Sequence, residues 1–429
     1  MPIFAGSIAY APMPEGWQGT ADEFLQQSGQ LATIFISGNF LTGFYYPTGT
    51  TPPPTLPTSD QGPVVINGQW YFWDPVSGQY LPQTQSVKPA RNFCRNAIYQ
   101  LQQTGPTFTL ASGVTNTYDM CLCRATVSNV LAIASDTGPL SSPDTDFCSS
   151  SIRYTVGPTL VPTLAATDIF AHEHLIEGMD VSPIRGQTLA LSFSVWVNQP
   201  GNYSAYITNN GRDMSYVFPF TISTANQWAR IKINNVPAFP TSNGTWSFSE
   251  GNTGLYLGVV MGVGGQYKTS APNTWVSGFF AGTTANSNML TVLNNQMKIS
   301  GVKFEASATS TYLSVEPFEN DYFGCIRYYF TTFNYQSLTA GFPFIMQSQS
   351  NNNAFGSMLF ERRMAKVPTV VPYGWVSHAA GNVTNISTNA DVATATLPST
   401  QKGCGGSIAT TGTKGDTFAC LFTADARLG

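Results

Sequence analysis

The sequence of 429 residues predicts an all-β protein. Several runs alternate apolar and polar residues with a period of two, which is typical of half-buried strands. Clusters rich in Gly and Asn separate these runs, as expected for turns between strands. Only 10% of the residues are charged, against roughly 25% in a typical soluble domain. Hydroxyl and amide side chains must therefore keep the surface polar, which suits extended β structure and close packing against partners.

Residues 1–86 are predicted to form a small N-terminal module. Thr20 and Glu23 form a capping box, in which each side chain satisfies a free backbone N–H, so a short helix is expected over 21–27. This is the only helix start that the sequence marks clearly. The proline-rich segment 47–57 is expected to be an extended spacer, because proline has no N–H to donate inside a sheet. An aromatic run, a tight turn and a second short run then predict a hairpin near the end of the module.

Residues 87–315 are predicted to form one β-sandwich or jelly roll. Three runs place alternating apolar side chains on a core face and polar side chains opposite: 189–197, 228–233 and 255–263. Gly- and Asn-rich turns lie between them, at 198–202, 209–212, 243–244 and 252–254. Many strands with such turns and no helical period are typical of this fold class.

Residues 316–429 are predicted to form a C-terminal β-sandwich, a tip domain. Its strand candidates are 328–333, 343–346, 367–373 and 418–422. The junction 298–330 is expected to contain the last strand of the preceding domain, with Lys303 and Glu305 on the polar face. A short connector ending at Pro317 and the first strand of the tip domain would follow.

Charge and composition argue against several function classes. The net charge is −4 and no Lys/Arg cluster occurs, so nucleic-acid binding by phosphate neutralisation is not expected. No stretch reaches the ~18 apolar residues of a membrane span, and residues 1–17 do not have the pattern of a secretory signal. The seven cysteines are irregularly spaced in mostly apolar surroundings, which predicts reduced, buried thiols.

The sequence carries no recognisable catalytic motif, and no catalytic residue is predicted. His172-Glu-His174 and Cys121-x-Cys123 contain metal-binding side chains. However, the histidines share a face only in an extended segment, and C-x-C is not the usual zinc spacing, so no metal and no cofactor is expected. Four carboxylates crowd one region: Asp168, Glu173, Glu177 and Asp180. Nothing pairs two of them across a cleft as a glycosidase requires, and we interpret them as turn and cap positions.

Aromatic residues beside Asn-, Asp- and Gly-containing loops are better candidates for a binding site. An aromatic plane packs against the C–H face of a sugar, and amide or carboxylate groups bind the hydroxyls. The candidates are Trp196, Tyr206, Tyr216, Trp246, Tyr267 and Trp275. For each of them the alternative is packing between sheets or against a neighbouring subunit.

Several segments resemble, in order, the jelly-roll domain of fibre and appendage proteins of tailed bacteriophages. At the junction, 301–305, 316–319 and 325–329 are similar to that family's G-V-Q-L-E, E-x-R-P-x-x-x-E-L and C-Q-R-Y-Y. Further similar segments are 91–96 with Gln103, 176–178 with 189–197, 218–222 with 226–228, and 420–428. Each motif alone is modest, but their shared order is specific.

The N-terminal module adds to this resemblance. Segments 60–63 and 69–75 are similar to the module that docks a phage fibre to its particle. The chain departs from the family pattern at Ala97, which replaces a glycine, at Ile326, which replaces a glutamine, and at the cysteine-bearing segment 120–123. These departures concern local detail rather than the order of the motifs.

The resemblance implies a structural virion protein, made in the host cytoplasm and located on the tail, neck or head as an appendage, most often a homotrimer. Its function would be non-catalytic attachment to host-surface polysaccharide, with weak sites on several tips acting together. Contacts with other virion structural proteins would use the N-terminal module, with Trp70, Trp73 and Tyr80 as the docking candidates.

Two alternatives remain open at the level of sequence. The chain fits a purely structural, decoration or assembly protein of the virion that binds no receptor, because a fold does not fix a function. It also fits a polysaccharide-degrading tailspike. Binding to host polysaccharide separates the first alternative from attachment, and release of reducing ends separates the second.

Overall fold

The computed structural model contains two compact units, residues 1–89 and 90–429. It describes residues 90–428, except 106, 141–146, 336, 338, 395 and 410, and the strand residues of the first unit. These strands are β1 (Phe44–Tyr45), β2 (Val64–Ile66), β3 (Gln69–Asp74) and β4 (Gln79–Pro82), which form one sheet in that order. Antiparallel pairing of β3 with β4 confirms the predicted hairpin. The predicted helix and proline-rich spacer lie outside the described residues.

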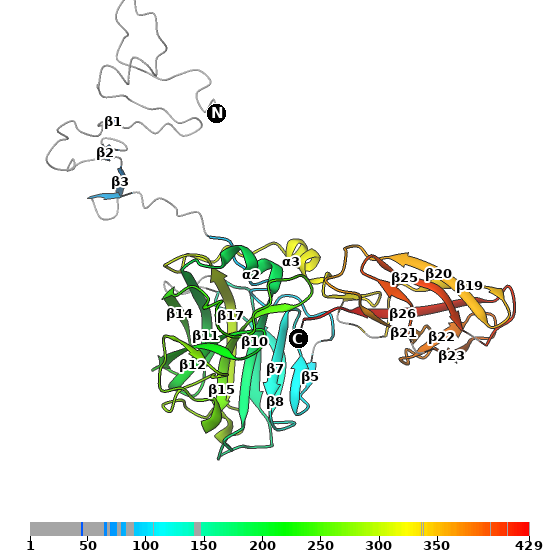
Figure 1. Ribbon diagram of the computed structural model, residues 1–429, viewed down its shortest axis with the longest axis horizontal. Coiled ribbons are helices and arrows are strands. Elements are labelled where there is room, and N and C mark those ends of the chain that lie inside the picture. The colour runs from blue at the N-terminus through cyan, green and yellow to red at the C-terminus, as the bar shows by residue number, and fades with distance from the viewer. Residues whose placement is uncertain are drawn as a thin grey trace, which may run out of the picture. The chain divides into compact units, whose positions relative to one another are not determined.

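The first part of the second unit is a jelly-roll sandwich of two antiparallel sheets (Figure 1). Its seven-stranded sheet has the order β16-β13-β12-β15-β10-β7-β6 and its six-stranded sheet the order β14-β11-β17-β9-β8-β5. The first sheet contains β6 (Gly113–Asn116), β7 (Cys121–Ala125), β10 (Ile169–Glu177), β12 (Gly201–Asn209), β13 (Met214–Ile222), β15 (Thr253–Val263) and β16 (Trp275–Ser277). The second contains β5 (Thr107–Thr109), β8 (Leu131–Thr137), β9 (Ser150–Val156), β11 (Leu189–Val197), β14 (Gln227–Val236) and β17 (Gln296–Glu305). The all-β prediction is confirmed.

The sandwich core contains the apolar faces that the sequence predicted. In β11 every odd-numbered residue from Leu189 to Val197 is buried, and in β15 the same holds from Leu255 to Val263. The opposite face of β11 carries the predicted polar residues, but these are also buried. Ser192 and Ser194 are fully buried because the guanidinium of Arg230, from the neighbouring strand β14, donates hydrogen bonds to both hydroxyls.

The predicted polar face of the junction strand β17 is also buried. Lys303 and Glu305 are 1% and 0% exposed and form an ion pair at 3.0 Å. The following segment covers them, since the backbone N–H and hydroxyl of Thr311 both donate to the Glu305 carboxylate. A buried ion pair that satisfies its remaining hydrogen bonds avoids the desolvation cost of a lone charge.

A helix that we did not expect follows the predicted connector and precedes the first strand of the tip domain. Helix α3 (Phe318–Cys325) begins directly after Pro317, and Glu319 and Asp321 lie in its first turn. A proline at the start needs no N–H donor, and acidic side chains complement the positive end of the helix dipole. Shorter helices occur elsewhere: α2 (Gly178–Val181), η1 (Ser182–Ile184), η2 (Gly265–Tyr267) and η3 (Met289–Thr291).

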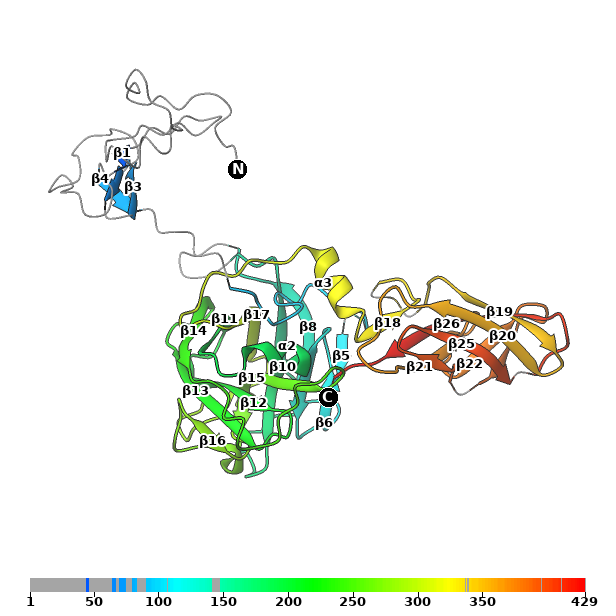
Figure 2. The ribbon, with the colours of Figure 1, turned by 45° about the horizontal axis from the view of Figure 1, so that its top comes forward.

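The remaining strands form one nine-stranded sheet with its own apolar core. They are β18 (Tyr329–Thr331), β19 (Phe344–Ser350), β20 (Asn353–Leu359), β21 (Thr369–Gly374), β22 (Asn382–Asn385), β23 (Ala390–Ala393), β24 (Ser399–Thr400), β25 (Gly403–Ala409) and β26 (Thr417–Asp425). The last strand, β26, pairs with β18, β19, β21 and β22. It then returns the chain end to the sandwich (Figure 2). There Leu428 packs with Met120 and Leu175.

Two predictions about the chain as a whole can be compared with the structure. All seven cysteines are free and buried, as predicted. Among the described residues, no helix has the length and apolar character needed to cross a membrane.

Candidate functional site

Three of the six predicted aromatic candidates meet at one place on the sandwich. The ring centroid of Trp275 lies 5.4 Å from that of Tyr216 and 5.7 Å from that of Trp246. Phe239 joins them, 5.1 Å from Trp246, and Phe248 lies beside Trp246 with its ring parallel to within 1°. We call these five residues the aromatic cluster.

The local sequence explains how the cluster forms. Trp275 in β16 is the direct cross-strand partner of Tyr216 in β13, which brings the two rings to one side of the sheet. Trp246 comes from the loop between β14 and β15. The indole N–H of Trp275 donates to the carbonyl of Pro237 at 3.0 Å, and that of Trp246 donates to the carbonyl of Asn243 at 2.6 Å. Both indoles are therefore fixed by the loop that carries Trp246.

The cluster has a buried base and a partly exposed rim. Tyr216 and Phe239 are 4% and 5% exposed and belong to the sandwich core. Trp246, Phe248 and Trp275 are only partly buried and pack on that core. Exposed polar residues surround the rim: Asn243, Thr245, Asn273, Thr274 and Ser277. The arrangement offers flat apolar surface beside amide and hydroxyl groups, which is the chemistry that sugar rings require.

Asp213 links the loop that carries Trp246 to the turn between β12 and β13. Its carboxylate accepts hydrogen bonds from the Thr245 backbone N–H at 2.8 Å and hydroxyl at 2.7 Å, and from the Asn209 amide at 2.5 Å. The hydrogen bond from the Thr245 backbone, with those from the Asn209 amide and the Thr245 hydroxyl, outweighs the opposing effect of burial and holds the pKa of Asp213 below its ordinary value. The loop is therefore ordered around an ionised carboxylate. Sequence reasoning missed Asp213, Phe239 and Phe248.

Trp196 lies on the outer face of the other sheet, apart from the aromatic cluster. It is partly buried and lies between two cross-strand partners, Trp228 and Lys298. The Lys298 ammonium is 4.5 Å from the centroid of the Trp196 ring and 3.0 Å from the carboxylate of Asp136. This cation–π contact gives the ring a structural partner, although part of its surface stays open.

The structure places Tyr206 in the interior, so it offers no surface for a ligand. Its side chain is 0% exposed, and its hydroxyl donates to Glu173 at 2.5 Å. Phe279 packs on the Tyr206 ring at 5.8 Å and on Tyr267 at 5.3 Å. The segment that carries Tyr267 and Phe279 covers this face of the seven-stranded sheet. Tyr206 is therefore not retained as a candidate. No local pattern in the sequence indicated that this segment covers it.

The docking candidates lie in the N-terminal sheet. Trp70 and Trp73 belong to β3 and Tyr80 to β4, and Trp73 pairs with Tyr80 across the hairpin. Their side chains are outside the described residues, so their role stays a prediction.

Each of the four crowded carboxylates has structural partners. Glu173 is fully buried and its two oxygens accept from the Arg212 guanidinium at 2.5 and 2.7 Å. Burial alone raises the pKa of Glu173, but the charge and hydrogen bonds of Arg212, with smaller effects of Arg124 and Tyr206, outweigh it and hold the pKa below its ordinary value. The carboxylate is therefore ionised and paired within the protein.

The other three carboxylates hold local structure. Asp168 accepts from Thr126 and the backbone of Ala165, Asp180 from Arg91 and Arg95, and Glu177 from the backbone of Gly251, from Arg327 and from Tyr328. Asp168 and Asp180 lie at a turn and in the short helix α2, as interpreted. The interpretation was wrong for Glu173 and Glu177, which belong to the buried strand β10. Glu177 has a further role, because its partners Arg327 and Tyr328 follow α3 and so connect the sandwich to the tip domain.

The His172 and His174 side chains do share a face, and Cys121 joins them. One ligand atom from each of the three lies within 4.8 Å of the others, and all three residues are buried. Nε2 and Nδ1 of His172 lie 2.9 and 2.8 Å from the hydroxyls of Tyr99 and Tyr154. Burial, with a smaller effect of His174, lowers the pKa of His172 well below its ordinary value, and burial lowers the pKa of His174 to about 4. Both rings are neutral at pH 7.

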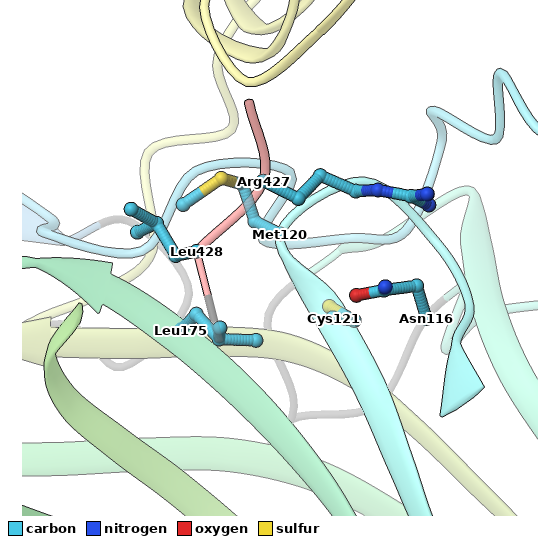
Figure 3. A pocket seen from close by; sticks show the side chains of 6 residues that line it. All are labelled: Asn116, Met120, Cys121, Leu175, Arg427 and Leu428. Carbon is cyan, nitrogen blue, oxygen red and sulfur yellow. The ribbon is translucent and has the colours of Figure 1, made fainter. Parts of the chain in front are cut away.

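A small pocket, partly open to solvent, lies beside Cys121. It is lined by Asn116, Met120, Cys121, Leu175, Arg427 and Leu428, and Figure 3 shows Leu428 and Leu175 on one side with Cys121 and Asn116 on the other. The pocket thus forms where the chain end meets the edge of the seven-stranded sheet. Its lining is mostly apolar and contains no aromatic ring, which makes it a poor glycan site.

Comparisons with known proteins do not assign a family. No family model matches the chain, and no curated protein matches it. Solved structures similar to it include the carbohydrate-binding module TmCBM61 in complex with β-1,4-galactotriose (10% identity, 51% of this chain, 100% of that chain, TM-score 0.26). A second is a family 11 carbohydrate-binding module from Clostridium thermocellum in complex with a β-1,3-1,4-mixed-linked tetrasaccharide (9% identity, 48% of this chain, 98% of that chain, TM-score 0.24). A third is a family 30 carbohydrate-binding module (10% identity, 51% of this chain, 90% of that chain, TM-score 0.24). At these TM-scores and identities, the similarities establish neither a family nor a ligand for this chain.

Proposed function

We propose that this protein is a structural appendage of a tailed-phage virion that attaches, without catalysis, to polysaccharide on the host surface. The observation that carries the proposal is the aromatic cluster, whose partly exposed rim of Trp246, Phe248 and Trp275 is surrounded by exposed amides and hydroxyls. The ordered resemblance to phage fibre proteins supports the virion role.

The chemistry of the rim suits weak, reversible sugar binding. Phe248 stacks with Trp246 and also contacts the guanidinium of Arg185, 4.7 Å from its ring centroid, so a sugar ring would pack on the partly exposed indoles of Trp246 and Trp275. The indole N–H groups of Trp246 and Trp275 are already bonded to loop carbonyls, so recognition of hydroxyls would fall to nearby side chains such as Asn243. A shallow site of this kind needs several copies to hold a cell surface, which a fibre with repeated subunits supplies.

Self-association as a homotrimer is part of this proposal. The tip domain exposes large apolar side chains, with Leu359 80% and Phe342 78% exposed. No charged residue occurs between Arg327 and Glu361, so two copies of this surface would not repel each other. The N-terminal module, with Trp70 and Trp73, would then bind another virion protein.

The test compares the full chain with three variants on arrays of purified bacterial capsular polysaccharides and lipopolysaccharide O-chains. Trp246→Leu keeps apolar volume against the core but removes the flat ring, and Trp275→Leu does the same for β16. Trp196→Leu on the other sheet is the matched control. We expect the two rim variants to lose binding and the Trp196 variant to keep it.

Two results would support the alternatives instead. Absence of binding to every polysaccharide, even with the chain immobilised at high density, would favour a purely structural virion protein. Release of new reducing ends from a bound polysaccharide would show a degrading tailspike.

A further inference from the structure

Two adjacent strands bring a thiol and two imidazoles together inside the sandwich. Strands β7 and β10 are antiparallel neighbours, and their register places Cys121 directly opposite His174 and Cys123 directly opposite His172. Residues two apart on a strand share a face, so His172 and His174 both point to the side where Cys121 lies. The three donors sit on rigid, hydrogen-bonded backbone in the core.

The separation of these groups suits a shared metal ion. Cys121 Sγ lies 3.5 Å from Nδ1 of His174. A thiolate at about 2.3 Å and an imidazole nitrogen at about 2.0 Å from a tetrahedral Zn²⁺ are about 3.5 Å apart. One ligand atom of His172 lies within 4.8 Å of both, so a small movement of its ring completes three ligands. Three protein ligands drawn from Cys and His are typical of zinc sites in which another ligand occupies the fourth coordination position.

The second ring nitrogen of His174 has an acceptor close by. Nε2 of His174 makes no hydrogen bond of standard geometry, and the backbone carbonyl of Arg95 lies beside it. A buried ring nitrogen is satisfied when its tautomer directs a proton to such an acceptor. A metal on Nδ1 would fix the tautomer with its proton on Nε2, directed to that carbonyl.

A nearby phenol and a route from solvent complete the site. Tyr99 has the left-handed backbone angle φ = 56°, uncommon for a bulky residue, and its hydroxyl lies 2.9 Å from Nε2 of His172. If the metal takes that nitrogen, the Tyr99 oxygen is a candidate for the fourth position. The pocket beside Cys121 gives an ion a path from the chain surface to the thiol.

We propose that Cys121, His172 and His174 bind one divalent transition-metal ion with affinity for thiolate, for which Zn²⁺ is the probe. On binding, the Cys121 thiol gives its proton to solvent and the thiolate and two neutral imidazoles donate electron pairs to the ion. Tyr99 or Tyr154 releases its hydrogen bond to the His172 nitrogen that becomes a ligand. The site lies inside the fold, away from the aromatic cluster, so its role is to stabilise the sandwich.

The test uses the full chain without a histidine tag, purified in a non-thiol reductant and reconstituted with Zn²⁺ or Co²⁺. We expect about one equivalent of metal per chain by mass spectrometry of the metal. With Co²⁺ we expect the near-ultraviolet thiolate-to-cobalt charge-transfer absorption. Cys121→Ser and His174→Asn should abolish both signals. The matched control is Cys123→Ser, because Cys123 is equally buried on the same face of the same strand and should keep them.

Circular dichroism shows whether each core variant folds. If one does not, the metal content and cobalt absorption of the wild-type chain still test the proposal. The proposal is overturned if the folded wild-type chain, refolded from denaturant with Zn²⁺ present, holds no stoichiometric metal, or if Cys121→Ser retains the charge-transfer absorption. In that case the cluster is a hydrogen-bonded core and nothing more. Neither result affects the glycan proposal, which the Trp246 variant tests separately.

Discussion

Arg212 places its guanidinium against both carboxylate oxygens of Glu173, at 2.5 and 2.7 Å, and 3.7 Å from the centroid of the Tyr256 ring. This pair lies on the face of the seven-stranded sheet that Phe279 covers. An ion pair beneath a covering segment leaves no open surface on that part of the sheet. The glycan candidates therefore lie in the loop and edge-strand cluster around Trp246.

Replacing Glu173 with Gln should destabilise the sandwich by about 3 kcal/mol, because it leaves the Arg212 charge without its buried counter-ion. Urea unfolding of the wild type and the variant measures the difference. Asp136→Asn, which disrupts a pair with Lys298 that is partly open to solvent, is the control and should cost below about 1 kcal/mol. Equal losses for the two variants would contradict the assignment of a buried, structural pair.

Glycan binding should depend on the ionisation of Asp213. The ordered loop binds the ionised carboxylate and lowers its pKa. Ionisation of Asp213 therefore stabilises the ordered loop fully at pH values above the ordinary pKa of Asp, ~3.9. This stabilisation is lost as the pH falls through the lower pKa that Asp213 has in the folded chain. Binding measured between pH 7 and pH 3 should be level down to about pH 4 and then fall. Asp213→Asn should bind more weakly at pH 7, and a decline that starts well above pH 5 in the wild type would contradict this account.

Arg327 should be required for a firm junction between the sandwich and the tip domain. It donates to Glu177 at 3.1 Å and to Glu250 at 2.6 Å, so Arg327→Ala leaves the fully buried Glu177 with fewer partners. We expect a loss of about 2 kcal/mol in stability and faster amide exchange over 316–328. Polysaccharide binding by each folded chain should be unchanged. Amide exchange over 316–328 that is the same in the variant and the wild type would contradict the structural role of Arg327.

Self-association should depend on the exposed apolar residues of the tip domain. Replacing both Phe342 and Leu359 by Ser removes the two most exposed large apolar side chains among the described residues. Light scattering after size-exclusion chromatography should show a trimer for the wild type and a smaller species for the double variant. Val292→Ser on the sandwich, 55% exposed in the wild type, is the control, and a trimer in all three chains would rule out this surface as the interface.

The sequence predicts those features of the fold that depend on neighbouring residues, and it does not predict those that depend on contacts between residues far apart in the sequence. The alternation in Leu189–Val197 identified a strand, because burial of one face is a local signal. It did not show that Arg230 buries the other face, since that contact depends on the pairing of β11 with β14. Helix α3 was missed because its start is marked only by Pro317 and two acidic residues.

The same limit applies to the candidate sites. Tyr216, Trp246 and Trp275 were predicted individually, but their meeting depends on the pairing of β13 with β16 and on a loop from elsewhere in the chain. Tyr206 has the same local signal and is buried, because its environment is set by a covering segment more than sixty residues later in the printed sequence. The spacing of His172 and His174 was visible, whereas their approach to Cys121 follows from the register of β7 with β10.

The most direct test of the central claim is the affinity of the full chain for the polysaccharide that it binds best on the array, compared between the wild type, Trp246→Leu and Trp196→Leu. Calorimetry should show that Trp246→Leu weakens each site by about tenfold, which is about 1.4 kcal/mol, while Trp196→Leu binds as the wild type does. Undiminished binding by a correctly folded Trp246→Leu chain would contradict attachment through the aromatic cluster.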